Sequence, residues 1–264
     1  MQPLYDMTHT YWFTLIATIV VLALVHEVGL LIGRRIKEER AVEKREAVEG
    51  VGTAMLALLG LLLGFTFSMS DQRYAARKRI VLDEVNAIGT TYLRAKMLPP
   101  PHDQHAQELL RQYVALRTEP PTVATLDVAL RRTAELQRRL WDDARATAAL
   151  DTHSHITALY VQSLNNMIDL NNARVTVGVY QRLPPAITNL LYLAAVMSIG
   201  VFGYGLGLKR RRAQVPITSL VVAIALVLTV IVDYNRVGDP IAKVGVQGYK
   251  DLQKQMAADI AASR

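Results

Sequence analysis

One uncharged stretch, Val51–Met69, constrains the fold of this chain more than any other part of the sequence. It is apolar and long enough to cross a bilayer core of about 30 Å. A polar segment follows without an intervening proline and keeps helical spacing, with Val81, Val85 and Ile88 on one side. A membrane helix next to a separate soluble helix would give a similar composition. The unbroken pattern favours a single helix from Val51 to Leu98, roughly 45 residues and about 70 Å long.

The composition indicates a helical membrane protein. Of the 264 residues 51% are hydrophobic, and these are gathered in blocks along the chain. Aromatic residues make up only 6% and strand-like alternation is scarce, so the polar part should also be helical. The absence of cysteine excludes disulfides, thiolate metal sites and cysteine nucleophiles. The net charge of +7 is also typical of nucleic-acid binding, but most Lys and Arg residues flank the apolar blocks, so we expect no nucleic-acid partner.

Four apolar blocks are candidates for membrane helices. Tyr11 and Trp12 stand at the start of the first block, where aromatic residues anchor a helix at the interface. The second block carries Gly60 and Gly64, a spacing of small residues that lets helices approach closely, and the third is also rich in glycine. The expected helices span residues 11–32, 51–69, 186–208 and 215–232.

The sequence therefore predicts an all-α membrane protein in contact with the lipid bilayer. Four transmembrane helices should form two hairpins, with an extramembrane helical domain between helices two and three. We place the first hairpin in residues 1–70, the helical domain in 71–185 and the second hairpin in 186–234. Residues 235–264 form a tail with a short amphipathic helix at about 248–261.

The basic residues predict an orientation for these helices. The short connections 34–49 and 209–214 carry six and four basic residues, whereas residues 1–10 carry none. The positive-inside rule then places both connections in the cytoplasm, and both termini and the helical domain on the extracytoplasmic side. Arg73 and Arg77 argue for the opposite orientation, but charges on long domains count little in this rule.

Ionisable residues within membrane segments are candidates for function, and His26 and Glu27 lie in the last third of the first expected helix. Both are within about two turns of Arg34 and Arg35, so they could also reach the interface or face partner helices. The sequence leaves their role open.

Two histidine pairs, His102 with His105 and His153 with His155, have spacings that suggest a metal site at first sight. No nearby acidic residue completes either set, and residues two apart point to different sides of a helix. We therefore expect surface histidines, with no metal and no cofactor.

A polar stripe marks the end of the helical domain. Asn165, Asp169 and Asn172 recur at i, i+4 and i+7, so they share one side of a helix. One interpretation is a path for a ligand or ion. The other, which we favour, is a polar seam between packed helices, satisfied by polar residues of the long helix, and we group Glu84 with it.

Four stretches resemble the signature of the bacterial bestrophin-like membrane proteins, a family of unknown function. The resemblance covers nearly the whole chain and implies a multi-pass protein of the bacterial inner membrane. The stretches are LLGFTFSMSDQRYAARKRIVLDEVNAIGTTYLRAKMLP, ELLRQYVALR, SLNNMIDLNNAR and DYNRVGDPIAKVGVQGYKDLQKQM.

The true bestrophins, which are pentameric anion channels, are similar at a greater distance. The likeness rests on Gly64-Phe65 followed by Arg73 and an aromatic residue. In bestrophins this helix lines a narrow hydrophobic neck, whose positions would fall here on Ala57, Leu61 and Phe65. These residues share one side of a helix. The resemblance implies a cytoplasmic middle domain, against the charge rule, and the acidic calcium-binding cluster of animal bestrophins has no counterpart here.

Two functions remain as hypotheses. The first is an oligomeric ion channel of four or more subunits, permeable to anions, in which Leu61 and Phe65 form a hydrophobic gate. Arg73 and Arg77 would raise the anion concentration at its mouth. The alternative is a non-conducting sensor or scaffold whose helical domain binds a partner or ligand through the stripe around Asp169. An enzyme is not expected, because the sequence has no phosphate-binding glycine loop, catalytic triad motif or paired carboxylates in an apolar setting.

Overall fold

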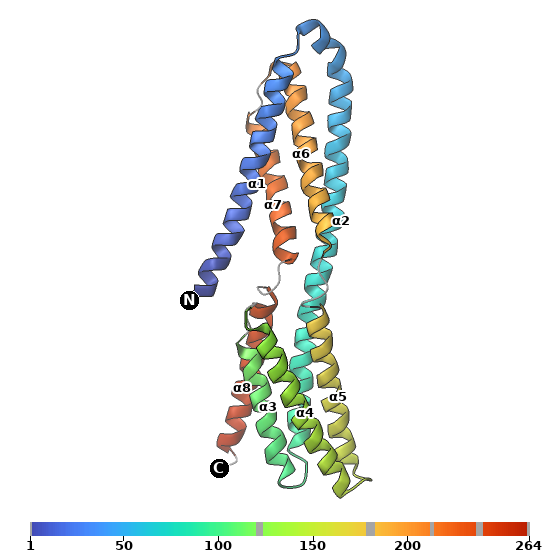
Figure 1. The fold of residues 1–264 in the computed structure, drawn as a ribbon, viewed down its shortest axis with the longest axis vertical. Coiled ribbons are helices and arrows are strands. Elements are labelled where there is room, and N and C mark those ends of the chain that lie inside the picture. Colours follow the sequence, from blue (N-terminus) through green and yellow to red (C-terminus); the bar gives the residue numbers. More distant parts are fainter. Residues whose placement is uncertain (1, 120–123, 178–182, 212–213, 236–239, 263–264) are drawn as a thin grey trace. The chain divides into compact units, whose positions relative to one another are not determined.

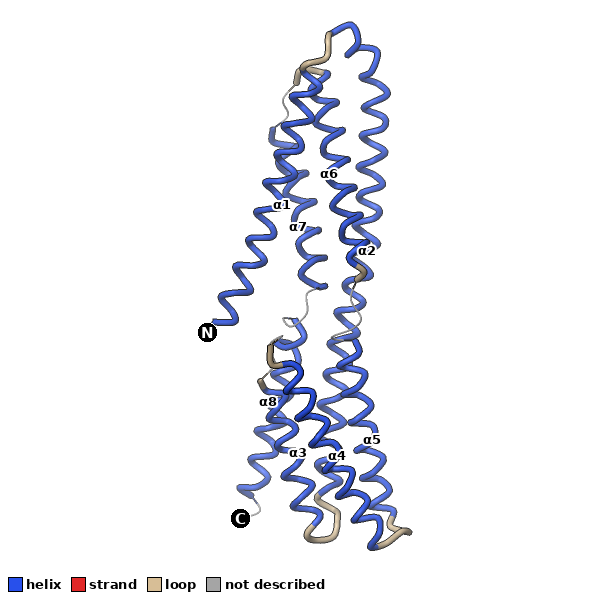
Figure 2. The backbone as a smooth tube through the Cα atoms, viewed as in Figure 1, coloured by secondary structure: helices blue, strands red, loops and turns tan. Residues whose placement is uncertain are grey.

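The computed structural model describes residues 2–119, 124–177, 183–211, 214–235 and 240–262. These residues form α-helices and contain no strand (Figures 1 and 2), as the sequence predicts. The helices are α1 (Gln2–Arg34), α2 (Glu38–Ala95), α3 (His102–Thr118), α4 (Leu126–Leu150), α5 (His155–Val175), α6 (Pro185–Leu208), α7 (Gln214–Asn235) and α8 (Pro240–Ala262).

Helix α2 is continuous over 58 residues, so the predicted union of the apolar and polar segments is confirmed. It begins earlier than predicted because the charged segment before Val51 is rich in Glu, Lys, Arg and Ala, which favour helix. Glu38 and Glu39 in its first turn also interact favourably with the helix dipole. The helix ends at Ala95, ahead of the prolines that begin at Pro99 and disfavour helical backbone before them.

Four helices contain stretches that are long and apolar enough to cross a membrane. They are α2 and the segments Thr10–Arg34, Pro185–Leu208 and Gln214–Asn235 of α1, α6 and α7. Each of the four membrane helices expected from the sequence lies within one of them.

The chain divides into two compact units. Unit 1 comprises Met1–Arg73 and Leu183–Arg236, and unit 2 comprises Tyr74–Arg182 and Val237–Arg264. Helix α2 contributes its first part to unit 1 and its last part to unit 2. The C-terminal helix α8 belongs to unit 2, where it packs along α3, rather than forming a separate tail.

In unit 1, α1 packs along both α6 and α7. The approach to α6 is close because glycines of the two helices face each other's backbone, and a Cβ added at Gly203 would overlap the carbonyl oxygen of His26. Helix α2 meets this group through larger side chains, and Ser198 Oγ of α6 donates to the carbonyl oxygen of Met55 at 3.3 Å. Buried leucines from all four helices form the core of unit 1: Leu22, Leu59, Leu191 and Leu228.

In unit 2, the last part of α2 packs with α3, α4, α5 and α8 around one hydrophobic core. The apolar side of α2 predicted from the sequence faces this core, with Ile88 fully buried and Val81 nearly so. The other helices contribute large side chains that are also almost fully buried: Leu110, Tyr113, Leu140, Leu164 and Met256. This core surrounds a polar cluster on which the candidate site is centred.

Candidate functional site

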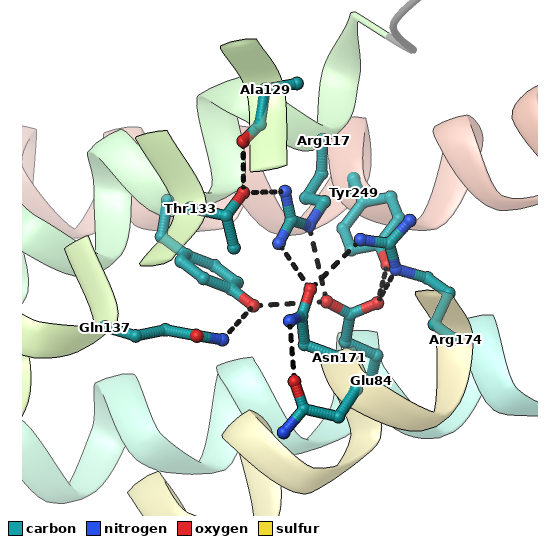
Figure 3. A network of polar contacts seen from close by, with 10 residues as sticks. Glu84, Arg117, Ala129, Thr133, Gln137, Asn171, Arg174 and Tyr249 are labelled. Atoms are coloured by element: carbon teal, nitrogen blue, oxygen red, sulfur yellow. Dashed lines mark hydrogen bonds and ion pairs between the residues drawn. The ribbon is translucent and has the colours of Figure 1, made fainter. Parts of the chain in front are cut away.

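The polar cluster of unit 2 is built around the carboxylate of Glu84, whose side chain has no exposed surface (Figure 3). The Tyr113 hydroxyl donates to Oε1 at 3.3 Å and the Tyr249 hydroxyl donates to Oε2 at 2.6 Å. Arg117 Nε also donates to Oε1, at 3.3 Å, and Arg174 Nε forms an ion pair with Oε2 at 2.5 Å. Helices α3, α5 and α8 are thus all tied to the single carboxylate that α2 supplies.

A second layer of hydrogen bonds fixes the two guanidinium groups. Arg117 Nη1 donates to Thr133 Oγ1 at 2.9 Å, and Thr133 Oγ1 donates to the carbonyl oxygen of Ala129 in α4 at 2.8 Å. The side-chain oxygen of Asn171 accepts from Arg117 at 2.8 Å and from Arg174 at 3.1 Å. Figure 3 shows these bonds next to Glu84. All five helical segments of unit 2 therefore contribute to one network.

The protonation states in this network follow from burial and charge. Burial raises the pKa of the Tyr113 hydroxyl, and the charge of Glu84 adds to the rise, so this phenol stays neutral. Burial and Glu84 raise the pKa of Tyr249 in the same way. Burial by itself would lower the pKa of Arg117, but the charge of the Glu84 carboxylate raises it, so the guanidinium stays charged.

These contacts give the Glu84 network a structural role. A carboxylate has about four lone-pair positions, and here it accepts three hydrogen bonds and forms an ion pair with Arg174, so its charge is held by protein groups. Two guanidinium groups and one carboxylate also leave a net charge of +1 in the buried cluster. A buried charge is tolerated only when it is paired and hydrogen-bonded, which this arrangement achieves.

The structure separates Glu84 from the residues with which the sequence grouped it. Asn165, Asp169 and Asn172 are exposed, and Asn165 donates to Asp169 at 3.3 Å. The neighbouring Asn171 is the buried one and bonds to both arginines of the network. The reason is the orientation of α5, which turns its apolar side inward: Tyr160, Leu164 and Met167 are fully buried, and Asn171 continues that side. This apolar spacing was the signal that would have identified Asn171.

The side of α2 predicted to form a neck is not covered by other described residues of the same chain. Ala57 is exposed, Leu61 is 55% exposed and Phe65 is 65% exposed. Next to them, a Cβ added at Gly60 or Gly64 would meet no atom within 4 Å. The close approach expected at these two glycines is therefore not made to any described residue of the same chain.

The two arginines predicted to attract anions differ in exposure. Arg73 is half-buried, whereas Arg77 is buried, with 6% of its surface exposed. Each of them interacts with at least one other group. Arg77 is therefore largely shielded from solvent, whereas Arg73 reaches it.

One pair of histidines has an acidic partner that the sequence did not reveal. His102 Nδ1 and His105 Nδ1 lie 2.8 Å and 3.1 Å from the same oxygen, Oδ1 of the buried Asp143. Asp143 comes from α4, far along the chain, so local spacing could not show it. Among the residues that the structure describes, no group of three such side chains has the arrangement of a metal site. The other pair, His153 and His155, is exposed as predicted.

The described residues form an all-helical protein with several membrane-type helices and a buried polar network. The chain belongs to the bestrophin-like family, because the model of the bestrophin-like domain matches residues 19–237. The family resemblance found in the sequence is therefore confirmed. The crystal structure of a bacterial bestrophin homologue from Klebsiella pneumoniae has a similar fold, with a TM-score of 0.58 and 13% sequence identity over 92% of this chain and 98% of that chain. A search of curated proteins gives no significant match.

Proposed function

We propose that this protein assembles into a closed ring of four or more copies in the bacterial inner membrane and conducts anions along the ring axis. Membership of the bestrophin-like family supports a channel, because that family and fold include anion channels. The four apolar helices support a membrane location. Within the ring, the uncovered side of α2 would line the pore.

The observation that carries this proposal is the exposure of two neighbouring sides of α2. Leu61 and Phe65 lie on one side, and Gly60 and Gly64 lie about 100° round the helix axis from them. Small residues let a second helix approach closely, whereas large apolar side chains that narrow a channel can gate it by excluding water. We assign the glycine side to contact with the next copy and the side with Leu61 and Phe65 to the pore.

The charge near the end of this segment suits an anion. Arg73 follows the pore-lining stretch on the same helix and is half-buried, so its field reaches solvent. The buried Arg77 adds positive charge one turn further along α2. We propose that these two arginines raise the anion concentration at the pore entrance.

The subunit count tests the assembly directly. Native mass spectrometry of the detergent-purified full chain should give a single closed oligomer of four or more copies, and liposomes that contain it should pass chloride more readily than empty ones. A monomer or dimer would remove the pore, because one helix per copy cannot then enclose an axis. A closed ring that passes no anion would support the proposed assembly but contradict the proposed conduction.

The orientation is a second part of the proposal. The charge rule places the connection around Lys37 in the cytoplasm and unit 2 outside it. Because the chain contains no cysteine, a single cysteine at the exposed Lys37 or at the exposed His153 can be labelled cleanly in sealed vesicles. The two positions should react from opposite sides, with Lys37 on the cytoplasmic side. Reaction from the same side would contradict the four-span topology, and the reverse sidedness would contradict the charge rule alone.

A non-conducting sensor is the second candidate, and the exposed side chains of Asn165, Asp169 and Asn172 favour it. Amides and a carboxylate on an open helix surface can bind a polar partner without any rearrangement of the core. Under this alternative the same protein would be a dimer or monomer in detergent and would give no anion flux.

A further inference from the structure

A pocket of about 130 Å³ lies in unit 1 between α1 and α7. Most of its wall is apolar and includes Ile19, Leu30 and Val221. Its polar lining residues are His26 and Glu27 on the α1 side and Gln214 and Thr218 on the α7 side. Both helices are of the membrane-spanning type, so this pocket is a largely apolar recess with a few polar side chains.

His26 is the unusual feature of the pocket. Its side chain is buried, with only 6% of the residue's surface exposed, and it lines the recess. Its Nδ1 lies 3.9 Å from Glu27 Oε1, but its Nε2 is buried and has no hydrogen-bond partner in the described part of the chain. A buried polar nitrogen without a partner is costly, so a bound molecule that supplies one is strongly favoured there.

A second unpartnered nitrogen lies on the same helix. Arg34 follows Leu30, which lines the pocket, by one helical turn on the same side of α1. Its Nε is buried and has no hydrogen-bond partner among the described residues. The Cα atoms of His26 and Arg34 are about 12 Å apart along the helix axis. Side chains of an α-helix lean toward its N-terminus, which from Arg34 is the direction of the pocket.

The spacing and polarity of these groups fit one class of ligand. A glycerophospholipid carries a phosphate, then ester carbonyl groups, then acyl chains, in that order along its length. Arg34 at the end of α1 suits the phosphate, His26 can donate to an ester carbonyl, and the apolar wall between α1 and α7 suits the start of an acyl chain.

The surroundings also favour a lipid. Val20 and Leu31 of α1 are each about half exposed, as expected of a helix side that faces the bilayer. We propose that the recess between α1 and α7 binds an anionic glycerophospholipid, with its phosphate at Arg34, an ester carbonyl at His26 Nε2 and acyl-chain methylenes against Leu30 and Val221. This site does not depend on ion conduction.

Native mass spectrometry with added lipid tests the site on the full chain. Phosphatidylglycerol should bind about fivefold more tightly than phosphatidylcholine with the same acyl chains, the effect of one arginine near an anionic headgroup. Arg34→Gln should abolish this preference. Arg35→Gln is the matched control, since it removes the same charge from the adjacent exposed residue and should leave the preference intact.

His26 is tested separately because it is assigned to the ester and not to the headgroup. His26→Leu should weaken the binding of both lipids about fivefold and keep their ratio. Thermal unfolding in detergent checks that each variant is folded, and His26→Gln, which keeps a donor, should restore part of the affinity.

Three outcomes would overturn the proposal. Equal affinity of the wild type for the two lipids would contradict the assignment of an anionic headgroup to Arg34. Equal losses in Arg34→Gln and Arg35→Gln would show diffuse attraction by surface charge. Displacement of the lipid by millimolar inorganic phosphate would identify a phosphate site that needs no acyl chain.

Discussion

Two glycine pairs with the same spacing have opposite surroundings in this protein. Gly203 and Gly207 of α6 press against α1, and a Cβ added at either would overlap a backbone carbonyl oxygen, that of His26 or that of Leu30. Gly60 and Gly64 of α2 also lie four residues apart, but a Cβ added there would meet nothing within 4 Å. The spacing alone says that a helix can be approached closely, and the structure shows whether the chain itself does so.

Some helix sides are thus buried against neighbouring helices, whereas others are exposed. The polar residues of unit 2 show the same difference, because Glu84 is enclosed by side chains from three helices and Asp169 is exposed. Covered positions should be sensitive in stability measurements. Open positions should tolerate change and reveal themselves only in assembly, conduction or binding.

The largest expected effect is on the covered glycines. Gly203→Val should destabilise unit 1 by roughly 3 kcal/mol or more, because the new side chain meets backbone that cannot move aside. The midpoint of thermal unfolding in detergent should fall by about 6 °C or more. The matched variant Gly64→Val has free space within the described part of its own chain, so it should act on the contact between copies and lower the subunit count while unit 1 stays folded. Loss of the helix signal in both variants would contradict the difference in packing.

Loss of the buried carboxylate should have an effect of similar size on stability. Glu84→Ala leaves Arg117 and Arg174 without their anion in a buried site, and we expect a loss of about 3–5 kcal/mol in the free energy of unfolding. Asp83→Ala is the control, because Asp83 is exposed and its ion pair with the exposed Arg79 is long, with 3.9 Å between Oδ2 and Nε. Its loss should be within about 0.5 kcal/mol. Chemical denaturation followed by helix signal measures both, and similar losses would mean that the Glu84 network adds no stability of its own.

The open side of α2 should give a change in conduction without a change in stability. Phe65→Ala removes an exposed ring from the proposed neck, so anion flux into liposomes should rise several-fold while the midpoint of unfolding stays within about 1 °C. Phe67→Ala is the matched control, because Phe67 is not one of the proposed neck residues. Its ring stacks on the Tyr234 ring instead, with centroids 6.3 Å apart. Unchanged flux in Phe65→Ala, with the subunit count intact, would exclude Phe65 from the gate.

The smallest effect on the protein itself is expected at the exposed polar stripe. Asp169→Ala removes a surface carboxylate that accepts from Asn165, so the free energy of unfolding should change by less than about 0.5 kcal/mol. If the protein is a sensor, this variant should lose a partner that the wild type captures while ion conduction is unaffected. A large loss of stability would show that the stripe is buried in the assembled protein.

The candidate sites show where prediction from sequence stopped. The proposed neck positions Ala57, Leu61 and Phe65 could be placed on one side of a helix, since helical periodicity is a local property. The partners of Glu84 could not be assigned, because Arg117, Arg174 and Tyr249 reach it from helices far apart in the sequence. Asp143 likewise joins His102 and His105 only after α3 and α4 pack together.

The sequence by itself determined the all-helical fold, the apolar membrane-type helices and the continuity of α2. Uninterrupted hydrophobic blocks and the absence of proline from α2 are local properties, which act within a single segment. The sequence also identified the family. Only the tertiary structure decided which glycines are covered, which asparagine of α5 is buried and which histidine nitrogen lacks a partner. Those properties depend on how each helix is rotated about its axis against its neighbours, and that rotation is fixed by packing between segments that are distant in the sequence.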